Sequence, residues 1–144
     1  MSRLRILVLA PDSNPEGISI PYVTYSHAAA LAQIHDVSLV VGSPVEDRVR
    51  RAKAPFRSIE VVRMPWLERM YDWSFRRIFK SNFASQAVTA FGYPFAVAFE
   101  WHAWRQLRQR ILSGEFDVVL RLVPMTAVLP APLLSSCGRD LHPL

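Results

Sequence analysis

Residues 5–41 read RILVLAPDSNPEGISIPYVTYSHAAALAQIHDVSLVV, and this stretch decides the fold. Residues 6–10 form a short unbroken apolar run, which is typical of a parallel strand covered by helices on both faces. Residues 21–34 repeat apolar side chains at three- and four-residue spacing, which predicts a helix, and residues 37–41 predict a second strand. The stretch is therefore a βαβ unit whose polar loop, 12–21, leaves the carboxyl end of the first strand, where open α/β sheets bind ligands.

The alternation of strand and helix continues beyond this unit. A short charged segment at 46–53 is compatible with a helix, and residues 59–64 predict a third strand that Pro65 closes. The run FDVVLRLV at 116–123 predicts a fourth buried strand, closed by Pro124. Strands joined by helix-length connections instead of hairpin turns indicate an α/β fold with a mainly parallel sheet, right-handed crossovers and flanking helices.

The middle of the chain predicts two helices. Residues 66–83, WLERMYDWSFRRIFKSNF, form an aromatic and basic segment, and a break is expected at residues 92–94, where glycine, tyrosine and proline follow one another. A further helix is predicted over residues 95–113, where apolar side chains recur three or four positions apart. Gly114 suits the C′ position that ends this helix.

The composition describes a single globular domain. With 51% hydrophobic and 11% aromatic residues among 144, the chain has the apolar content for a core, which excludes a disordered protein. The pattern degrades after Pro124, so we assign the domain to 1–134 and an irregular tail to 135–144. The lone Cys137 cannot form an intramolecular disulfide, no signal-peptide pattern stands at the start, and no apolar run approaches about 20 residues. We therefore expect a reducing, cytoplasmic location and no membrane span.

The formal net charge of +5 lies mostly between residues 48 and 110 and favours an anionic partner. Tryptophan beside arginine suits a membrane interface, with the rings at headgroup depth and the cations on phosphates. The favoured interpretation, however, is an aromatic stripe packed on the sheet with solvated arginines. Nucleic acid is not expected, because no recognised binding motif accompanies the charge. The membrane-surface candidates are Trp73, Arg76, Arg77, Lys80, Arg105 and Arg108.

The loop DSNPEGISIP admits two interpretations. Its backbone amides can bind an anion at the start of the first helix, where unpaired N–H groups and the helix dipole favour negative charge. Alternatively the loop only caps that helix, with Ser19 or Asn14 as the cap. Gly17 alone matches neither G-x-G-x-x-G nor the Walker pattern, so nucleotide binding of those types is disfavoured.

No metal site or catalytic triad is predicted. The four histidines and the cysteine lack the spacing of metal ligands, and no G-x-S-x-G elbow occurs. No Ser/His/Asp or Cys/His arrangement can be derived from these spacings either. We therefore assign no catalytic base and no metal.

Taken as a set, RILVLAP, the proline- and glycine-bearing loop, SHAAALAQIHDVSLVV and FDVVLRLVP resemble the N-terminal domain of family 4 glycosyltransferases over residues 3 to 134. The resemblance implies a GT-B architecture, in which two Rossmann-like domains face each other across a cleft. The N-terminal domain receives the acceptor, the C-terminal domain holds a nucleotide sugar as co-substrate, and no metal is needed. It also implies these substrate-binding residues, in the first loop and at the end of the fourth strand: Asn14, Glu16, Gly17, Ser19 and Arg121.

Two departures from the family matter. Many members have paired glycines in the first loop, where this chain has only Gly17, and the donor-binding domain with its paired glutamates is absent. Sugar transfer needs donor and acceptor in near-attack geometry, so we expect this truncated chain to be inactive alone. The expected partners are a sugar or lipid-linked acceptor, an anionic inner-membrane surface and a separately encoded donor domain. A non-catalytic Rossmann-like binding module and a peripheral anionic-membrane binder are the alternatives.

Overall fold

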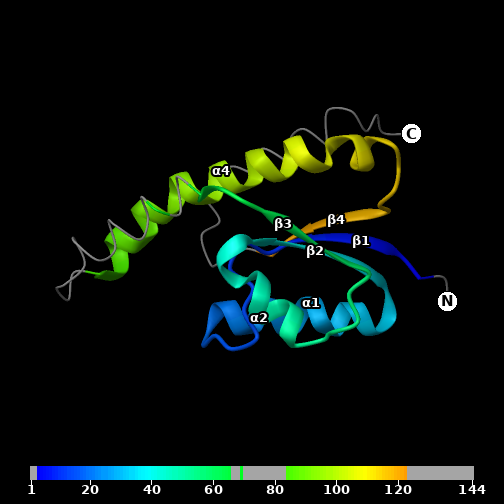
Figure 1. Ribbon diagram of the computed structural model, residues 1–144, viewed down its shortest axis with the longest axis horizontal. Helices are drawn as coiled ribbons and strands as arrows, with labels where there is room; N and C mark the ends of the chain where they lie inside the picture. Colours follow the sequence, from blue (N-terminus) through cyan, green and yellow to red (C-terminus); the bar gives the residue numbers. More distant parts are fainter. Residues whose placement is uncertain (1–2, 66–68, 70–83, 123–144) are drawn as a thin grey trace.

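The computed structural model describes residues 3–65, 69 and 84–122 of the chain (Figure 1). Its elements, in chain order, are β1 (Arg5–Leu9), α1 (Ile20–Ile34), β2 (Asp36–Gly42), the 3₁₀ turn η1 (Ser43–Val45), α2 (Glu46–Arg51), β3 (Ser58–Val62), α4 (Ala84–Leu112) and β4 (Val118–Arg121). Apart from residue 69, the predicted helix over 66–83 lies outside the described residues, as does the tail 135–144.

The four strands form one parallel sheet in the order β3-β2-β1-β4. β1 is central, and its Leu9 stands opposite Val40 of β2 and Arg121 of β4. All four strands therefore end at the same edge of the sheet, which we call the carboxyl edge. The predicted α/β class, a parallel sheet with flanking helices consistent with a Rossmann-like fold, is confirmed.

Helices cover both faces of the sheet, as Figure 1 shows, with α1 and α2 on one side and α4 on the other. Successive side chains of β1 point to opposite faces, so Ile6 and Val8 pack with Ala28 and Ala32 of α1. Leu7 and Leu9 belong to the second core, with side chains of β2, β3 and α4. Burial on both faces is the reason why residues 6–10, in and just after β1, form an unbroken apolar run. The α4 side chains at the centre of the second core are Phe99, Ala103 and Leu107.

Helix α4 differs from the prediction at one place. The expected break at residues 92–94 was wrong, because α4 runs without interruption over 29 residues. A proline removes one backbone donor and often kinks a long helix without ending it. The end of α4 is as predicted: Gly114 has φ +74°, its N–H donates to Ile111 O, and Glu115 N–H donates to Arg110 O. These two hydrogen bonds form a Schellman motif with glycine at C′.

Candidate functional site

The candidate site lies at the carboxyl edge, where the loop between β1 and α1 leaves the sheet. Ala10 N–H donates to Val40 O at 2.9 Å, and Gly42 N–H donates to Pro11 O at 3.0 Å. A Cβ on Gly42 would lie 3.1 Å from Pro11 O, so the glycine lets the β2 end approach the loop closely. Backbone pairing therefore holds the start of the loop against the end of β2.

Asn14 organises the loop itself. Its Oδ1 accepts a hydrogen bond from Glu16 N–H at 3.0 Å, its carbonyl accepts from Gly17 N–H at 3.1 Å, and its own N–H donates to Pro21 O at 3.0 Å. A Cβ on Gly17 would lie 3.1 Å from Pro21 Cβ and 3.2 Å from Asn14 O. Two of the predicted residues, Asn14 and Gly17, are thus in mutual contact and set the shape of the loop.

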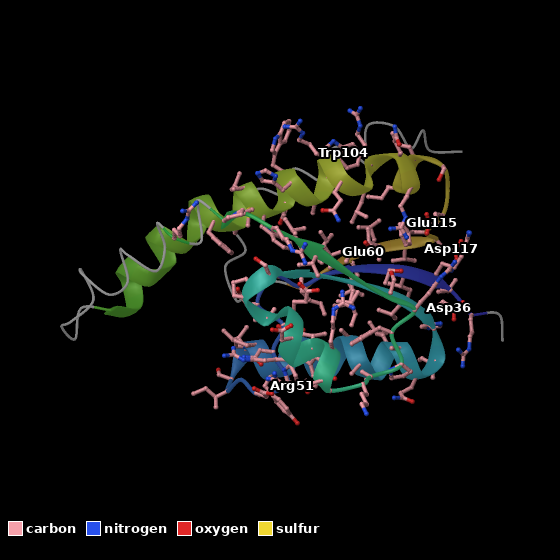
Figure 2. All side chains as sticks on the ribbon, in the orientation of Figure 1. Asp36, Arg51, Glu60, Trp104, Glu115 and Asp117 are labelled. Carbon is pink, nitrogen blue, oxygen red and sulfur yellow. The ribbon has the colours of Figure 1, made fainter. Side chains whose placement is uncertain are left out.

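Glu16 joins the loop to α2. Its carboxylate pairs with Arg51 at 2.9 Å and with Arg48 at 3.5 Å, and Figure 2 shows Arg51 on the helix layer below the sheet. The side-chain hydrogen bond that Arg51 donates to the Glu16 carboxylate raises the pKa of Arg51. Because these charges are exposed, the pairs contribute little stability, but they occupy the Glu16 carboxylate.

Ser19 occupies the N-cap position of α1 with φ 58° and makes no side-chain cap hydrogen bond. Its carbonyl accepts from Val23 N–H at 3.0 Å. The side-chain oxygen of Asn14 is used within the loop, so neither residue caps α1 in the way that the capping interpretation expected. A left-handed backbone at a serine is unusual and forms a sharp entry from the loop into the helix.

Arg121 ends β4 beside the start of the loop and forms an ion pair with Glu100 of α4. The side chains are 12% and 5% exposed, so this pair is buried at the carboxyl edge. Glu100 was not among the residues predicted for the site. The signal was present, since Glu100 is the sole acidic residue between 95 and 112, in a strongly apolar and aromatic segment. A buried acid in such a segment indicates a charged partner on the element it packs against.

Two further polar groups follow β1 at this edge. Ser13 is fully buried, and within the described part of the chain its hydroxyl has no hydrogen-bond partner. Protein packed around the Asp12 carboxyl removes water from it and raises its pKa, although the residue as a whole is exposed. Polar groups in unfavourable surroundings are enriched at functional sites, although they also occur elsewhere.

Exposed apolar side chains lie at the end of the loop and in the first turn of α1. Ile18 is 86% exposed, and Tyr22 and Val23 in the first turn of α1 are about half exposed. Together with the polar loop they form an amphipathic rim at the carboxyl edge. Such a rim suits a ligand that has both a polar and an apolar part.

The remaining predicted residues lie away from this edge or outside the described chain. Arg105 and Arg108 are exposed on α4. Trp73, Arg76, Arg77 and Lys80 fall outside the described residues. Within residues 3–65, 69 and 84–122, no three potential metal ligands come together, and no helix is both long and apolar enough to cross a bilayer.

Comparison of the chain with protein-family models, curated proteins and solved structures found no match.

Proposed function

We propose that this chain is the acceptor-side domain of a nucleotide-sugar-dependent glycosyltransferase of GT-B type, acting in the cytoplasm on a sugar or lipid-linked acceptor. The observation that carries the proposal is the position of the loop 12–19 at the carboxyl edge of a parallel sheet, the same edge at which Arg121 ends β4 opposite Leu9. Open α/β sheets bind their ligands at this edge, next to the loop that follows the central strand.

The residues of the edge have chemistry that suits an acceptor. Asn14 shapes the loop so that its backbone can present hydrogen-bonding groups to sugar hydroxyls. The exposed Ile18 and Tyr22 offer an apolar surface, which favours an acceptor with a lipid or another apolar portion. Transfer also needs a donor site, which in this proposal another domain supplies, so the chain alone is not expected to transfer sugar.

One observation supports a second candidate, a binding module without chemistry. Both charged residues of the predicted site have partners within the protein, because Glu16 pairs with Arg48 and Arg51, and Arg121 pairs with Glu100. Groups used in this way are less available for acid–base chemistry. The two candidates share the carboxyl edge as the binding site and differ in whether a donor domain completes it.

Titrations followed by two-dimensional amide NMR test the proposal. Short-chain lipid-linked monosaccharides and free oligosaccharides are added to the 144-residue protein, and UDP-glucose and GDP-mannose are added separately. We expect the acceptors to shift the amide signals of the non-proline residues of 12–19 and of Arg121, and the nucleotide sugars to shift none of them. Asn14→Ala should weaken acceptor binding, whereas Gln33→Ala, an exposed change near the far end of α1, should not.

Two results would contradict the proposal. Binding of a nucleotide sugar at the loop, with no response to any acceptor, would make this a donor or nucleotide domain. Acceptor-induced shifts confined to the opposite edge of the sheet would remove the loop from the site. A radiolabelled-donor assay adds a third check, because measurable sugar transfer by the isolated chain would show that it contains a complete active site.

A further inference from the structure

We infer that the outward face of α4 binds the surface of a bilayer that contains anionic phospholipid. This face, the outer stripe, consists of Trp101, Arg105, Arg108 and Leu112, which are spaced by four, three and four residues. Residues at this spacing lie on one side of an α-helix. The inference concerns a different surface from the carboxyl edge and does not depend on the proposed function.

The outer stripe points away from the sheet. Phe99, Ala103 and Leu107 are the α4 side chains buried against the strands, at 0–1% exposure. At about 100° per residue, the centre of the outer stripe lies about 180° around the helix from that buried stripe. In agreement with this geometry, Trp101 is 53% exposed and Leu112 is 55% exposed.

The charge of this face is only positive. Between residues 95 and 112 the sole acid is Glu100, which is buried and paired with Arg121. Arg110, the third arginine of this segment, points to the sheet side, where it pairs with Glu60 and Glu115 at 2.7 Å. Figure 2 shows Glu60 and Glu115 on that inner side of α4. Arg105 and Arg108, in contrast, form no ion pair with any residue in the described ranges, and both are exposed.

The combination of residues favours a lipid surface over other anions. Arginine binds lipid phosphates, and tryptophan is most stable at the depth of the headgroups. The stripe is about 16 Å long and lies along one side of the helix, so it can lie in the plane of an interface. A nucleic-acid backbone would use the arginines but would gain nothing from the aliphatic Leu112. The two arginines lie between the two apolar side chains along the stripe, so that the cations can reach lipid phosphates while Trp101 and Leu112 contact the same interface.

Vesicle flotation tests the inference with the whole chain. Binding is compared for vesicles of pure phosphatidylcholine and of phosphatidylcholine with phosphatidylglycerol, at low and high salt. We expect binding to the anionic vesicles only, and weaker binding at high salt. The double variant Arg105→Gln/Arg108→Gln should lower the partition coefficient by about 25-fold, which is about fivefold for each arginine near an anionic surface.

A charge-matched variant serves as the control. Lys53→Gln/Arg57→Gln removes the same charge from exposed positions near α2 and β3, and it should change the partition coefficient by less than about threefold. Trp101→Phe should abolish most of the tryptophan quenching by lipids brominated on their acyl chains. Circular dichroism confirms that each variant is folded, and acceptor binding by NMR should be unchanged in Arg105→Gln/Arg108→Gln, which separates this surface from the proposed active edge.

Several results would overturn the inference. Absence of binding to anionic vesicles at low salt would show that the outer stripe is not the contact surface. An equal fall in the partition coefficient in the two double variants would show the same. Quenching that persists in Trp101→Phe would show that other tryptophans meet the lipid. Displacement from vesicles by duplex DNA at equal phosphate concentration would assign the surface to nucleic acid instead.

Discussion

The buried ion pair between Glu100 and Arg121 yields the sharpest prediction about stability. The pair joins α4 to the end of β4, and the two side chains are 5% and 12% exposed. Replacing one partner leaves the other charge buried without its counter-charge, which costs about 3–5 kcal/mol. Replacing both with apolar side chains of similar volume removes that penalty, and such exchanges are often neutral. We therefore expect Glu100→Leu and Arg121→Met each to be strongly destabilising alone. Together they should change the free energy of unfolding only slightly.

The expected loss in the free energy of unfolding is large enough to measure. A domain of this length has a free energy of unfolding of about 7–20 kcal/mol, so either single change removes a large part of it. A loss of about 4 kcal/mol lowers the ratio of folded to unfolded protein about a thousandfold. With a urea slope of about 2 kcal/mol per molar, the midpoint should fall by about 2 M. The double variant should return to within about 1 M of the wild-type midpoint.

Equilibrium urea unfolding, followed by circular dichroism and by tryptophan fluorescence, measures all four proteins of this cycle. Coincident transitions by the two probes would justify the two-state treatment. The reasoning fails if each single change costs less than about 1 kcal/mol, because the pair would then be screened by solvent. It also fails if the cost in the double variant equals the sum of the single costs, because Glu100 and Arg121 would then stabilise the protein independently.

Three further changes test other parts of the fold. Gly114→Ala should cost about 1 kcal/mol, measured as a lower urea midpoint, because the C′ residue of α4 has φ +74°, and Gly114→Asn should cost less. Phe99→Ala should cost about 3–5 kcal/mol in the same assay, since this ring is fully buried between α4 and the sheet, and a midpoint within about 0.3 M of wild type would contradict this packing. The hydrogen bonds from Arg5 lower the pKa of Asp117 to about 2, so the stabilisation by this carboxylate is complete above about pH 4 and is lost as the pH falls toward 2. The melting temperature of Asp117→Asn should therefore depend less on pH between 4 and 2 than that of the wild type. Parallel plots of melting temperature against pH for the two proteins would contradict this prediction.

The parts of the fold that depend on local pattern could be predicted from the sequence. After its first residue β1 is an unbroken apolar run, and in β2 only Ser38 interrupts the apolar run 37–41, because both faces of these strands are buried; a short segment of this kind is typical of a strand inside a parallel sheet. Gly114 marked the end of α4 because only glycine adopts a left-handed C′ conformation at low cost. These signals are carried by a few adjacent residues, so no knowledge of tertiary contacts is needed to interpret them.

The parts that depend on distant partners could not be predicted in this way. The break expected at residues 92–94 relied on a local rule, and the helix continues through it. The loop residue Glu16 pairs with Arg51, which is 35 positions away, so its partner depends on how α2 folds back beside the loop. Glu100 could be recognised as an unusual buried acid, but its pairing with Arg121 requires the packing of α4 on β4. The sequence predicted the correct edge of the sheet for the loop. It did not predict that Asn14 bonds within the loop or that Glu16 pairs with α2.

The carboxyl edge holds a buried ion pair besides the exposed pairs of Glu16, and this buried pair supports the proposal that the carboxyl edge is the functional one. At the amino edge, Arg5 pairs with Asp117 at 2.6 Å and Arg3 with Asp36 at 3.6 Å, and Figure 2 shows both acids there, close to solvent. Such exposed pairs contribute little and are easily replaced by water. At the carboxyl edge the Glu100–Arg121 pair is buried, at a cost in desolvation that a similar apolar pair would avoid. Stability alone therefore gives no reason for charges in that position, and binding of a polar ligand at the same edge does.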